Sequence, residues 1–363
     1  MPEIDVDALK AALGAIADPH TGADLAAAGA VRSVGVDGDR VAVEVRLGYP
    51  AQGWKAALAA EVERVALGHP GVAQAAVQVG WKVAAHKVQK DLTPLPAVRN
   101  IIAVASGKGG VGKSTTSVNL ALALQAEGAR VGVLDADIYG PSIPKMLGLI
   151  GRPDSPDGKK ILPKAGHGLQ AMSIGLLVGE DTPMIWRGPM VTQAMQQLLT
   201  ECAWEDLDYL VIDLPPGTGD IQLTLSQRVP VSAAVIVTTP QDIALLDAKK
   251  ALQMFRKVEV PVLGIVENMA VHVCSNCGHA EHIFGAGGGE RMARDYEVPL
   301  LGALPLDIRI REQADGGTPT VAADPDSALS QTYREIARNA AARLSVQAKN
   351  KSIGFPNIVI QNT

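Results

Sequence analysis

The chain of 363 residues is poor in cysteine and in aromatic side chains, with three cysteines and 3% aromatic residues. Three cysteines are a poor basis for a disulfide framework, but two of them, Cys274 and Cys277, are close enough in sequence to share a metal or redox site. No apolar run reaches the roughly 18 residues that a membrane helix needs, and the acidic first residues differ from the basic start of a signal peptide. We therefore expect a cytoplasmic protein with no membrane partner.

An excess of basic residues is also missing, because 33 lysines and arginines face 38 aspartates and glutamates, for a net charge of −5. A protein built to neutralise nucleic-acid phosphates needs the opposite balance, so we expect no nucleic-acid partner. The hydrophobic content of 47% is enough for a sizeable core. At roughly 100–200 residues per domain, the length predicts two domains.

A glycine-rich loop follows the apolar run 101–105 and opens a helical pattern. It fits G-x-x-x-x-G-K-S/T, in which glycines let backbone N–H groups turn inward around phosphates. Lys113 can then reach the β- and γ-phosphate oxygens, and the Ser114 hydroxyl is placed to bind Mg²⁺ at the helix N-terminus. The sequence predicts a nucleotide site made of Gly107, Lys108, Gly109, Gly110, Val111, Gly112, Lys113, Ser114 and Thr115.

The early lysine, Lys108, makes this loop resemble the deviant P-loop of the nitrogenase-iron-protein, MinD and ParA group of ATPases. In that group the early lysine reaches across a dimer interface to the partner's nucleotide. The resemblance therefore implies ATP as the nucleotide and a homodimer as the active form. Outside such a loop, the same lysine would be a solvated surface residue.

Further apolar runs alternate with helical patterns from residue 101 onward. Strands this continuously hydrophobic are buried on both faces, which predicts an α/β fold with a parallel sheet covered by helices on both faces. Ligands then lie at the carboxyl ends of the strands. We predict an ATPase domain over 101–345 and a tail over 346–363, with strands at 131–134, 209–212, 234–237, 262–266 and 299–304.

The first 82 residues are predicted to form a small α+β domain with the order α-β-β-α-β. Residues 31–36 and 40–47 fit two strands joined by Asp37-Gly38, a strong hairpin signal. This domain, 1–82, resembles the iron–sulfur-assembly domain often fused ahead of such ATPases, but it has no cysteine. We expect it to dock to a partner or to the ATPase domain, with residues 83–100 as a linker.

Three aspartates stand at the ends of predicted strands. Asp213 ends an apolar strand as in a Walker B motif, where the carboxylate binds Mg²⁺ through water. Asp135 and Asp137 face the same side, so either could hold Mg²⁺-bound water or orient the attacking water. The resemblance assigns Asp137 to switch I, where it positions the nucleophile, and the Gly217 amide to switch II, where it senses the γ-phosphate. The expected catalytic residues are Lys108, Lys113, Asp137 and Asp213, and the expected Mg²⁺ residues are Ser114, Asp135 and Asp213.

Asn268 follows the strand 262–266. In the resembled group an asparagine amide at this place contacts adenine, so Asn268 is the candidate for base recognition. A capping role for its side chain is the alternative.

The C-x-x-C pair brings the two sulfurs of Cys274 and Cys277 to one metal, but two thiolates leave a tetrahedral site incomplete. A two-fold dimer would supply four thiolates, the ligand set of a [4Fe–4S] cluster or of zinc. The alternative is a zinc site within one chain, completed by His279 and His282. The single residue between Cys277 and His279 makes that site tight.

From residue 101 to about 320 the chain resembles Mrp/ApbC-type iron–sulfur cluster carrier ATPases. The resemblance implies a slowly hydrolysing homodimer that holds a [4Fe–4S] cluster at its interface and passes it to apo iron–sulfur proteins. The partners it implies are these apo-proteins and cluster scaffold proteins. Ser275 departs from the family, which more often has proline there. The residues that carry the resemblance are the P-loop, the pair Cys274/Cys277, and the segments 134–142, 185–190, 213–220, 238–241 and 283–289.

Two other functions share parts of this pattern. A MinD/ParA-like positioning ATPase with a structural zinc site would need a basic patch or an amphipathic C-terminal helix. Residues 328–348 do show helical spacing, but their apolar stripe more simply faces the core. An electron-donating reductase of the nitrogenase-iron-protein type normally has cysteines well separated in sequence, unlike the pair here.

Overall fold

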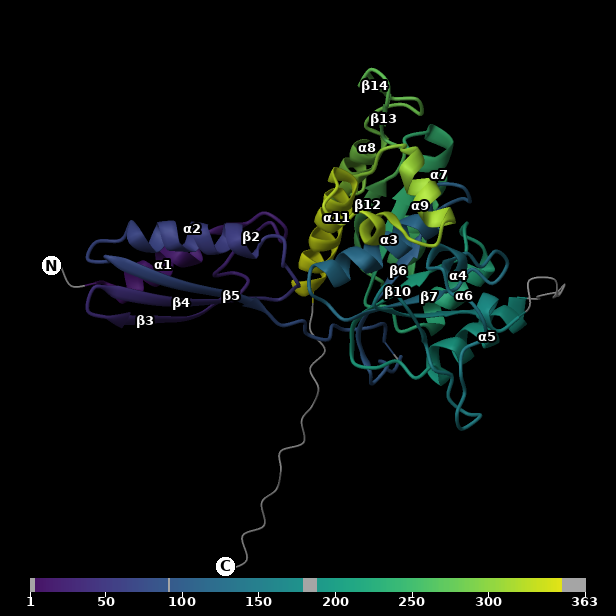
Figure 1. The fold of residues 1–363 in the computed structure, drawn as a ribbon, viewed down its shortest axis with the longest axis horizontal. Helices are drawn as coiled ribbons and strands as arrows, with labels where there is room; N and C mark the ends of the chain where they lie inside the picture. Colours follow the sequence, from purple (N-terminus) through teal and green to yellow (C-terminus); the bar gives the residue numbers. More distant parts are fainter. Residues whose placement is uncertain (1–3, 91, 179–187, 348–363) are drawn as a thin grey trace, which may run out of the picture.

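The computed structural model describes residues 4–90, 92–178 and 188–347 of the chain. Its ribbon has an N-terminal part, drawn in purple and blue, beside a larger part that contains the remaining elements (Figure 1). The N-terminal part holds α1 (Val6–Gly14), β1 (Ala17–Asp18), β2 (Ala23–Asp24), β3 (Val31–Asp37), β4 (Arg40–Leu47), α2 (Lys55–Leu67) and β5 (Gln74–Trp81).

The N-terminal sheet has the order β3-β4-β5, with β3 and β4 antiparallel and β5 parallel to β4. Alternate residues of β4, Val41, Val43, Val45 and Leu47, are buried, while Ala42 and Arg46 between them are exposed. Helices α1 and α2 lie on one face of this sheet (Figure 1). The predicted α-β-β-α-β order is confirmed, with the short β1 and β2 added after α1.

The larger part is built on an eight-stranded sheet with the order β15-β12-β11-β6-β10-β7-β9-β8. Neighbouring strands are parallel except β8, which pairs antiparallel with β9 at the edge. The predicted parallel sheet is confirmed, while β8 and β9 were not predicted because they are short and carry no long apolar run. The strands are β6 (Val98–Ala105), β7 (Val131–Asp135), β8 (Lys164–Gly166), β9 (Leu169–Ser173), β10 (Leu207–Asp213), β11 (Ala233–Thr238), β12 (Val262–Glu267) and β15 (Leu300–Ala303).

Helices pack on both faces of this sheet and enclose two apolar clusters. On one face lie α3 (Lys113–Ala126), α4 (Ile143–Met146), α10 (Thr320–Ala323) and α11 (Ala328–Ser345). On the other lie α5 (Gly188–Glu201), α6 (Asp220–Arg228), α7 (Asp242–Lys257) and α8 (Gly288–Asp295). The stripe of α11 is buried in the core, as predicted, at Leu329, Tyr333, Ile336, Ala340 and Leu344. Among residues 4–90, 92–178 and 188–347, none of the helices combines the length and the apolar character that a membrane span requires.

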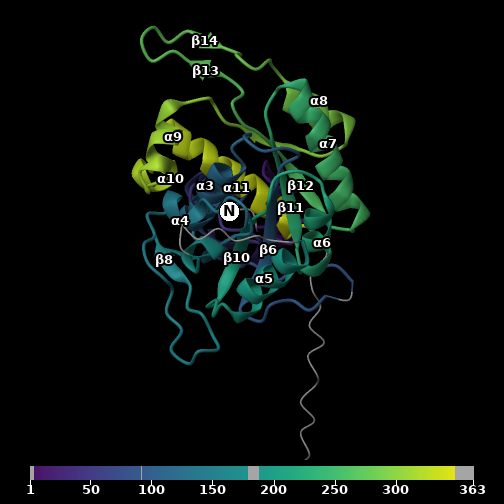
Figure 2. The same cartoon turned by 90° about the vertical axis from the view of Figure 1, so that its right-hand side faces the viewer.

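A two-stranded hairpin, β13 (His272–Val273) with β14 (Ala280–Glu281), leaves the sheet after β12. It projects away from the rest of the ribbon in both views (Figures 1 and 2). Helix α9 (Ile308–Asp315) follows β15. The hairpin carries the cysteine pair, so the thiols lie on an arm rather than in the core.

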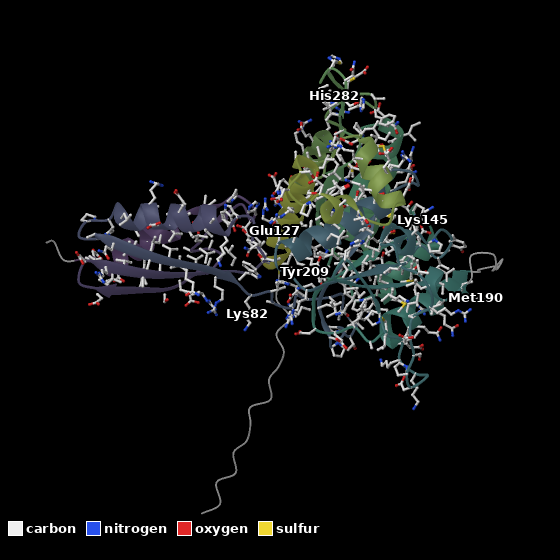
Figure 3. The ribbon with its side chains drawn as sticks, in the orientation of Figure 1. Lys82, Glu127, Lys145, Met190, Tyr209 and His282 are labelled. Atoms are coloured by element: carbon white, nitrogen blue, oxygen red, sulfur yellow. The ribbon has the colours of Figure 1, made fainter. Side chains whose placement is uncertain are left out.

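The two parts meet at Glu127, the residue that ends α3 (Figure 3). Its side chain is fully buried and accepts hydrogen bonds from the Gly53 backbone N–H at 2.8 Å, from Arg334 Nε at 2.7 Å and from Arg338 Nη1 at 2.8 Å. Gln52 N–H donates to the Glu127 carbonyl. The N-terminal part is thus docked against the far end of the helix that begins at the P-loop. The domain limits given above stay predictions.

Replacing Glu127 by alanine is expected to lower the free energy of unfolding by about 3 kcal/mol, because it leaves two mostly buried guanidinium groups without their carboxylate. Chemical denaturation followed by circular dichroism measures this change. Glu61→Ala is the matched control, since the Glu61–Arg64 ion pair is exposed and its loss should change stability little. Equal stability of the two variants would contradict the structural role of Glu127.

Candidate nucleotide site and cysteine arm

The P-loop requires glycine at the positions where its backbone turns most sharply. Gly110 and Gly112 both have φ near +81°, in the left-handed region that side chains disfavour. Gly107 packs against α7, and a Cβ there would lie 2.0 Å from the backbone carbon of Asp247. These constraints fix the turn that leads from β6 into α3.

Lys113 lies at the start of α3 and is 6% exposed. Its Nζ is 2.8 Å from Asp213 Oδ1, at the end of the neighbouring strand β10. The Ser114 hydroxyl donates to Asp213 Oδ2 at 2.6 Å, and the Ser117 hydroxyl donates to Oδ1 at 2.7 Å. The sequence analysis missed Ser117, although its place one helical turn after Lys113 could have indicated it.

The groups around Asp213 fit a magnesium ion. A carboxylate and the Ser114 hydroxyl meet at the N-terminus of α3, and oxygen atoms are the ligands that Mg²⁺ takes in proteins. The Lys113 ammonium at the same point can face phosphate oxygens when a nucleotide is bound. The structure therefore brings together Lys113, Ser114 and Asp213 as expected.

Asp137 reaches the same centre from the segment after β7. Its Oδ2 is 4.0 Å from Lys113 Nζ, and its side chain is mostly buried. Burial raises the pKa of the Asp137 carboxyl, and the nearby Lys113 ammonium opposes that rise. A carboxylate at this place can accept a hydrogen bond from a water molecule beside the phosphates.

Asp135 is turned toward its own loop. Its oxygens accept hydrogen bonds from the backbone N–H groups of Asp137, Ser142 and Ile143 and from the Ser173 hydroxyl, all at 3.0–3.1 Å. Burial and the neighbouring negative charge raise the pKa of Asp135 to about 7. In the conformation described, Asp135 fixes the segment that carries Asp137. Its role as a Mg²⁺ residue stays a prediction.

Two amide groups that are predicted to contact the nucleotide are instead hydrogen-bonded to residues of the P-loop and of the strand end before it. The Gly217 N–H donates to the Ser106 carbonyl at 3.1 Å. The Asn268 amide nitrogen donates to the Val111 carbonyl at 2.9 Å, and its oxygen accepts from Met269 N–H. The segments after β10 and β12 are therefore tied to the loop that would hold the phosphates. Contact with γ-phosphate and with adenine stays predicted for these two residues.

Asn268 also lines a cavity of about 410 Å³ beside the P-loop. The segment between β15 and α9 contributes Pro305 and Leu306 to the same lining. Both apolar and polar groups line it, as expected for a site that takes a nucleotide base. The P-loop residues on its wall are Gly110, Gly112 and Thr115.

Lys108 and Gly109 lie on the open side of the loop. Lys108 is partly exposed and Gly109 is exposed, while the Lys108 carbonyl accepts a hydrogen bond from the Ser106 hydroxyl at 2.9 Å. Within the described residues, the Lys108 ammonium makes no ion pair. This placement leaves the lysine accessible to a partner molecule.

Cys274 and Cys277 lie in the turn of the hairpin. The turn is closed by hydrogen bonds from Cys274 N–H to the His279 carbonyl and from Gly278 N–H to the Cys274 carbonyl. The backbone N–H groups of Asn276 and Cys277, together with the Cys277 thiol, lower the pKa of the Cys274 thiol. A lower pKa favours the thiolate, which is the form that binds metal.

His279 and His282 do not join the thiols in one cluster. The His282 Nδ1 is 2.7 Å from the Ala270 carbonyl, at the base of the hairpin, and His279 is exposed in the turn. Among residues 4–90, 92–178 and 188–347, no group of three or more His, Cys, Asp or Glu side chains is gathered as a metal site. Cys202, the third cysteine, directly follows α5 and is buried in the core.

Two predicted features lie outside the described residues. One is the first part of the segment 185–190, and the other is most of the tail 346–363.

The fold and this site define a P-loop NTPase: a mostly parallel sheet, a glycine loop capping α3, and a lysine and an aspartate that meet at its N-terminus. The family model described as the NUBPL iron-transfer P-loop NTPase matches residues 97–341, and the chain belongs to this family. Residues 6–79 match the model of the iron–sulfur cluster assembly protein family. The resemblance drawn from the sequence is therefore confirmed.

Curated proteins and a solved structure are similar to this chain over different lengths. An iron–sulfur cluster carrier protein of Pseudomonas fragi is 61% identical over 269 residues, which are 74% of this chain and 94% of that protein. One of Deinococcus radiodurans is 45% identical over 342 residues, 94% of this chain and 96% of that protein. A solved nucleotide-binding protein from Archaeoglobus fulgidus in complex with ADP is 40% identical, with a TM-score of 0.55, and covers 61% of this chain and 87% of its own.

The fold is also that of the cell division ATPase MinD of Pyrococcus furiosus. That structure is 24% identical with a TM-score of 0.50, and the match covers 66% of this chain and 97% of MinD. At this identity the match shows the fold alone.

Proposed function

We propose that the chain is an ATP-binding, slowly hydrolysing homodimer that carries a [4Fe–4S] cluster between its subunits and transfers it to apo iron–sulfur proteins. The observation that carries the proposal is the cysteine pair in the turn of an exposed hairpin, in a chain whose relatives are named iron–sulfur cluster carriers. Thiolates at the end of an arm can meet those of a second copy and remain accessible to a recipient. A cluster buried in a core could not be handed over.

Two thiolates from each of two chains complete the four-sulfur ligand set of a cubane cluster. A two-fold axis through the cluster would place Cys274 and Cys277 of both copies around it. The exposed position of the hairpin agrees with this arrangement (Figure 2). Zinc in the same four-thiolate site is the alternative cargo, and metal analysis decides between them.

The nucleotide chemistry rests on the groups gathered at the P-loop. Lys113 binds and orients the phosphates, and Asp137 holds a water molecule for attack on the γ-phosphate. Lys108 of the second copy adds positive charge to the same phosphates. Mg²⁺, held by Ser114 and Asp213 when present, neutralises charge on the phosphate oxygens. Slow turnover suits a protein whose nucleotide state regulates a cargo.

Anaerobic reconstitution with iron and sulfide tests the proposal. We expect about four iron and four sulfide ions per two chains, broad visible absorption, a dimer by native mass spectrometry, and loss of the cluster to an added apo-protein. A strictly monomeric protein that holds one zinc ion per chain through histidine would overturn it. So would a cluster that no apo-protein can take up.

Lys108→Ala is expected to leave ATP affinity nearly unchanged but to slow hydrolysis by about 100-fold to 1,000-fold, the range typical for removal of one group that stabilises charge in the transition state. ATPase assays across protein concentrations, with ATP affinity from calorimetry, measure the two effects separately. Lys145→Ala is the control, because that lysine is exposed on α4. Normal turnover of the Lys108 variant would contradict the role of Lys108 at the nucleotide of the second copy.

A further inference from the structure

The segment between β15 and α9, residues 304–307, is hydrogen-bonded to the base of the cysteine hairpin. Ala270 N–H donates to the Leu304 carbonyl at 2.9 Å, and Leu306 N–H donates to the Val271 carbonyl at 2.8 Å. The chain thus leaves β12 and enters the hairpin in direct contact with this segment. A movement of residues 304–307 therefore displaces the first residues of the hairpin.

Two histidines add side-chain contacts at the same place. His272 Nδ1 is 3.0 Å from the Leu306 carbonyl, and His282 Nδ1 is 2.7 Å from the Ala270 carbonyl. A carbonyl oxygen only accepts, so each Nδ1 carries the proton and donates. His282 is drawn in the projecting arm of Figure 3. One histidine therefore binds the hairpin to Leu306, and the other joins the two ends of the hairpin.

The same segment forms a wall of the 410 Å³ cavity beside the P-loop. Pro305 and Leu306 line it, together with Asn268 and Met269 from the end of β12. Met269 has φ near +57°, an unusual backbone for a bulky residue, at the point where the chain turns from the sheet toward the arm. The cavity wall and the base of the hairpin are therefore made of the same few residues.

We propose that a nucleotide base in this cavity controls the cysteine arm through Leu306 and His272. The inference rests on the proposed function for the identity of the cargo, a thiolate-bound cluster, but the contacts themselves do not depend on it. A base that packs against Leu306 restrains the carbonyl that holds His272, and it restrains the hairpin with it.

The size of the arm makes this control effective. A two-stranded hairpin as short as β13–β14 has little stability alone, so its order depends on the contacts at its base. A ligand shifts such an equilibrium only by the difference in its contacts with the two states. One hydrogen bond to Leu306 corresponds to about a fivefold change in the equilibrium constant between the ordered and the open hairpin.

Hydrogen–deuterium exchange of the hairpin, residues 270–283, tests the inference with ADP as the probe. In the full-length protein we expect ADP to slow exchange of these amides about fivefold. His272→Ala should reduce that difference, because only the two backbone hydrogen bonds between the segment and the hairpin then remain. ADP affinity should be kept, since His272 does not line the cavity. His272→Asn should restore the full difference, because the asparagine amide nitrogen can donate from nearly the same place as Nδ1.

Glu281→Ala is the matched control, because Glu281 is exposed and lies opposite His272 in the hairpin. This variant should keep the ADP effect. If saturating ADP does not alter hydrogen exchange of the hairpin in the native chain, the inference is overturned. It is also overturned if the ADP effect in His272→Ala equals that in the native chain.

The reconstituted protein provides a second readout. Transfer of iron to a chelator should differ about fivefold with and without ADP in the native chain, and this difference should be smaller in His272→Ala. If no cluster is bound at all, the proposed cargo fails while the exchange measurement still tests the arm. If a cluster is bound and transferred but ADP alters neither exchange nor release, only the control through Leu306 fails.

Discussion

A Lys113→Ala chain is expected to lose ATP affinity by about 100-fold or more. The ammonium is almost fully buried at the start of α3, beside Asp213 and Asp137, where few solvent molecules can replace it. Hydrogen bonds to charged groups contribute about 1.5–3 kcal/mol each, and a P-loop lysine makes more than one to the phosphates. Isothermal calorimetry with ATP and Mg²⁺ measures the loss.

The same substitution also leaves Asp213 without its ammonium partner, at a cost to stability of about 3 kcal/mol. Circular dichroism and thermal unfolding must therefore show that the variant is folded. Lys113→Gln, which keeps a neutral hydrogen-bond donor on a side chain one atom shorter, separates the loss of charge from a collapsed loop. Lys145→Ala is the control on the neighbouring α4. Unaltered ATP affinity in both Lys113 variants would refute the nucleotide site.

Cys274→Ala and Cys277→Ala are each expected to abolish the visible absorption of the reconstituted protein and to leave ATP affinity unchanged. Each change removes two of four thiolates from a dimeric site, and the remaining pair cannot hold a cubane cluster. Absorption spectra, iron analysis and ATP calorimetry on the same samples measure both properties.

The third cysteine supplies the control for these variants. Cys202 is buried, and its burial raises the pKa of the thiol to about 12, so it is not poised to bind metal. Cys202→Ala should keep the full absorption. Visible absorption retained in Cys274→Ala would mean that other side chains hold the metal. Absorption lost in Cys202→Ala would contradict the assignment of the metal site to the hairpin.

The nucleotide centre was largely readable from the sequence because its residues are close together along the chain or follow apolar strands. The spacing from Gly107 to Ser114 dictates a loop and a helix start, and the apolar strand before Asp213 places that residue at the carboxyl edge of the sheet. The structure brings Lys113, Ser114 and Asp213 together as predicted.

Other contacts join residues that are far apart in the sequence. The sequence around each of these residues does not predict the contact. Ser173 supports Asp135 from a strand that carried no recognisable apolar run. Asn268 and Gly217 were expected to face the nucleotide, but their amides are bonded to the P-loop in the conformation described. In the sequence, nothing distinguishes Glu127 from a surface glutamate. In the structure, two arginines of α11 and a loop of the N-terminal part enclose its side chain.

The sequence by itself determined the loop that binds phosphate, the parallel sheet behind it and the pairing of two thiols, because each depends on spacing within a few residues. Tertiary structure alone decided where the arm joins the cavity beside the P-loop. His272 and Leu306 are separated by more than thirty positions, and only the pairing of β12 with β15 brings their segments together. Hydrogen bonds of this kind are selected by packing, which local sequence does not encode.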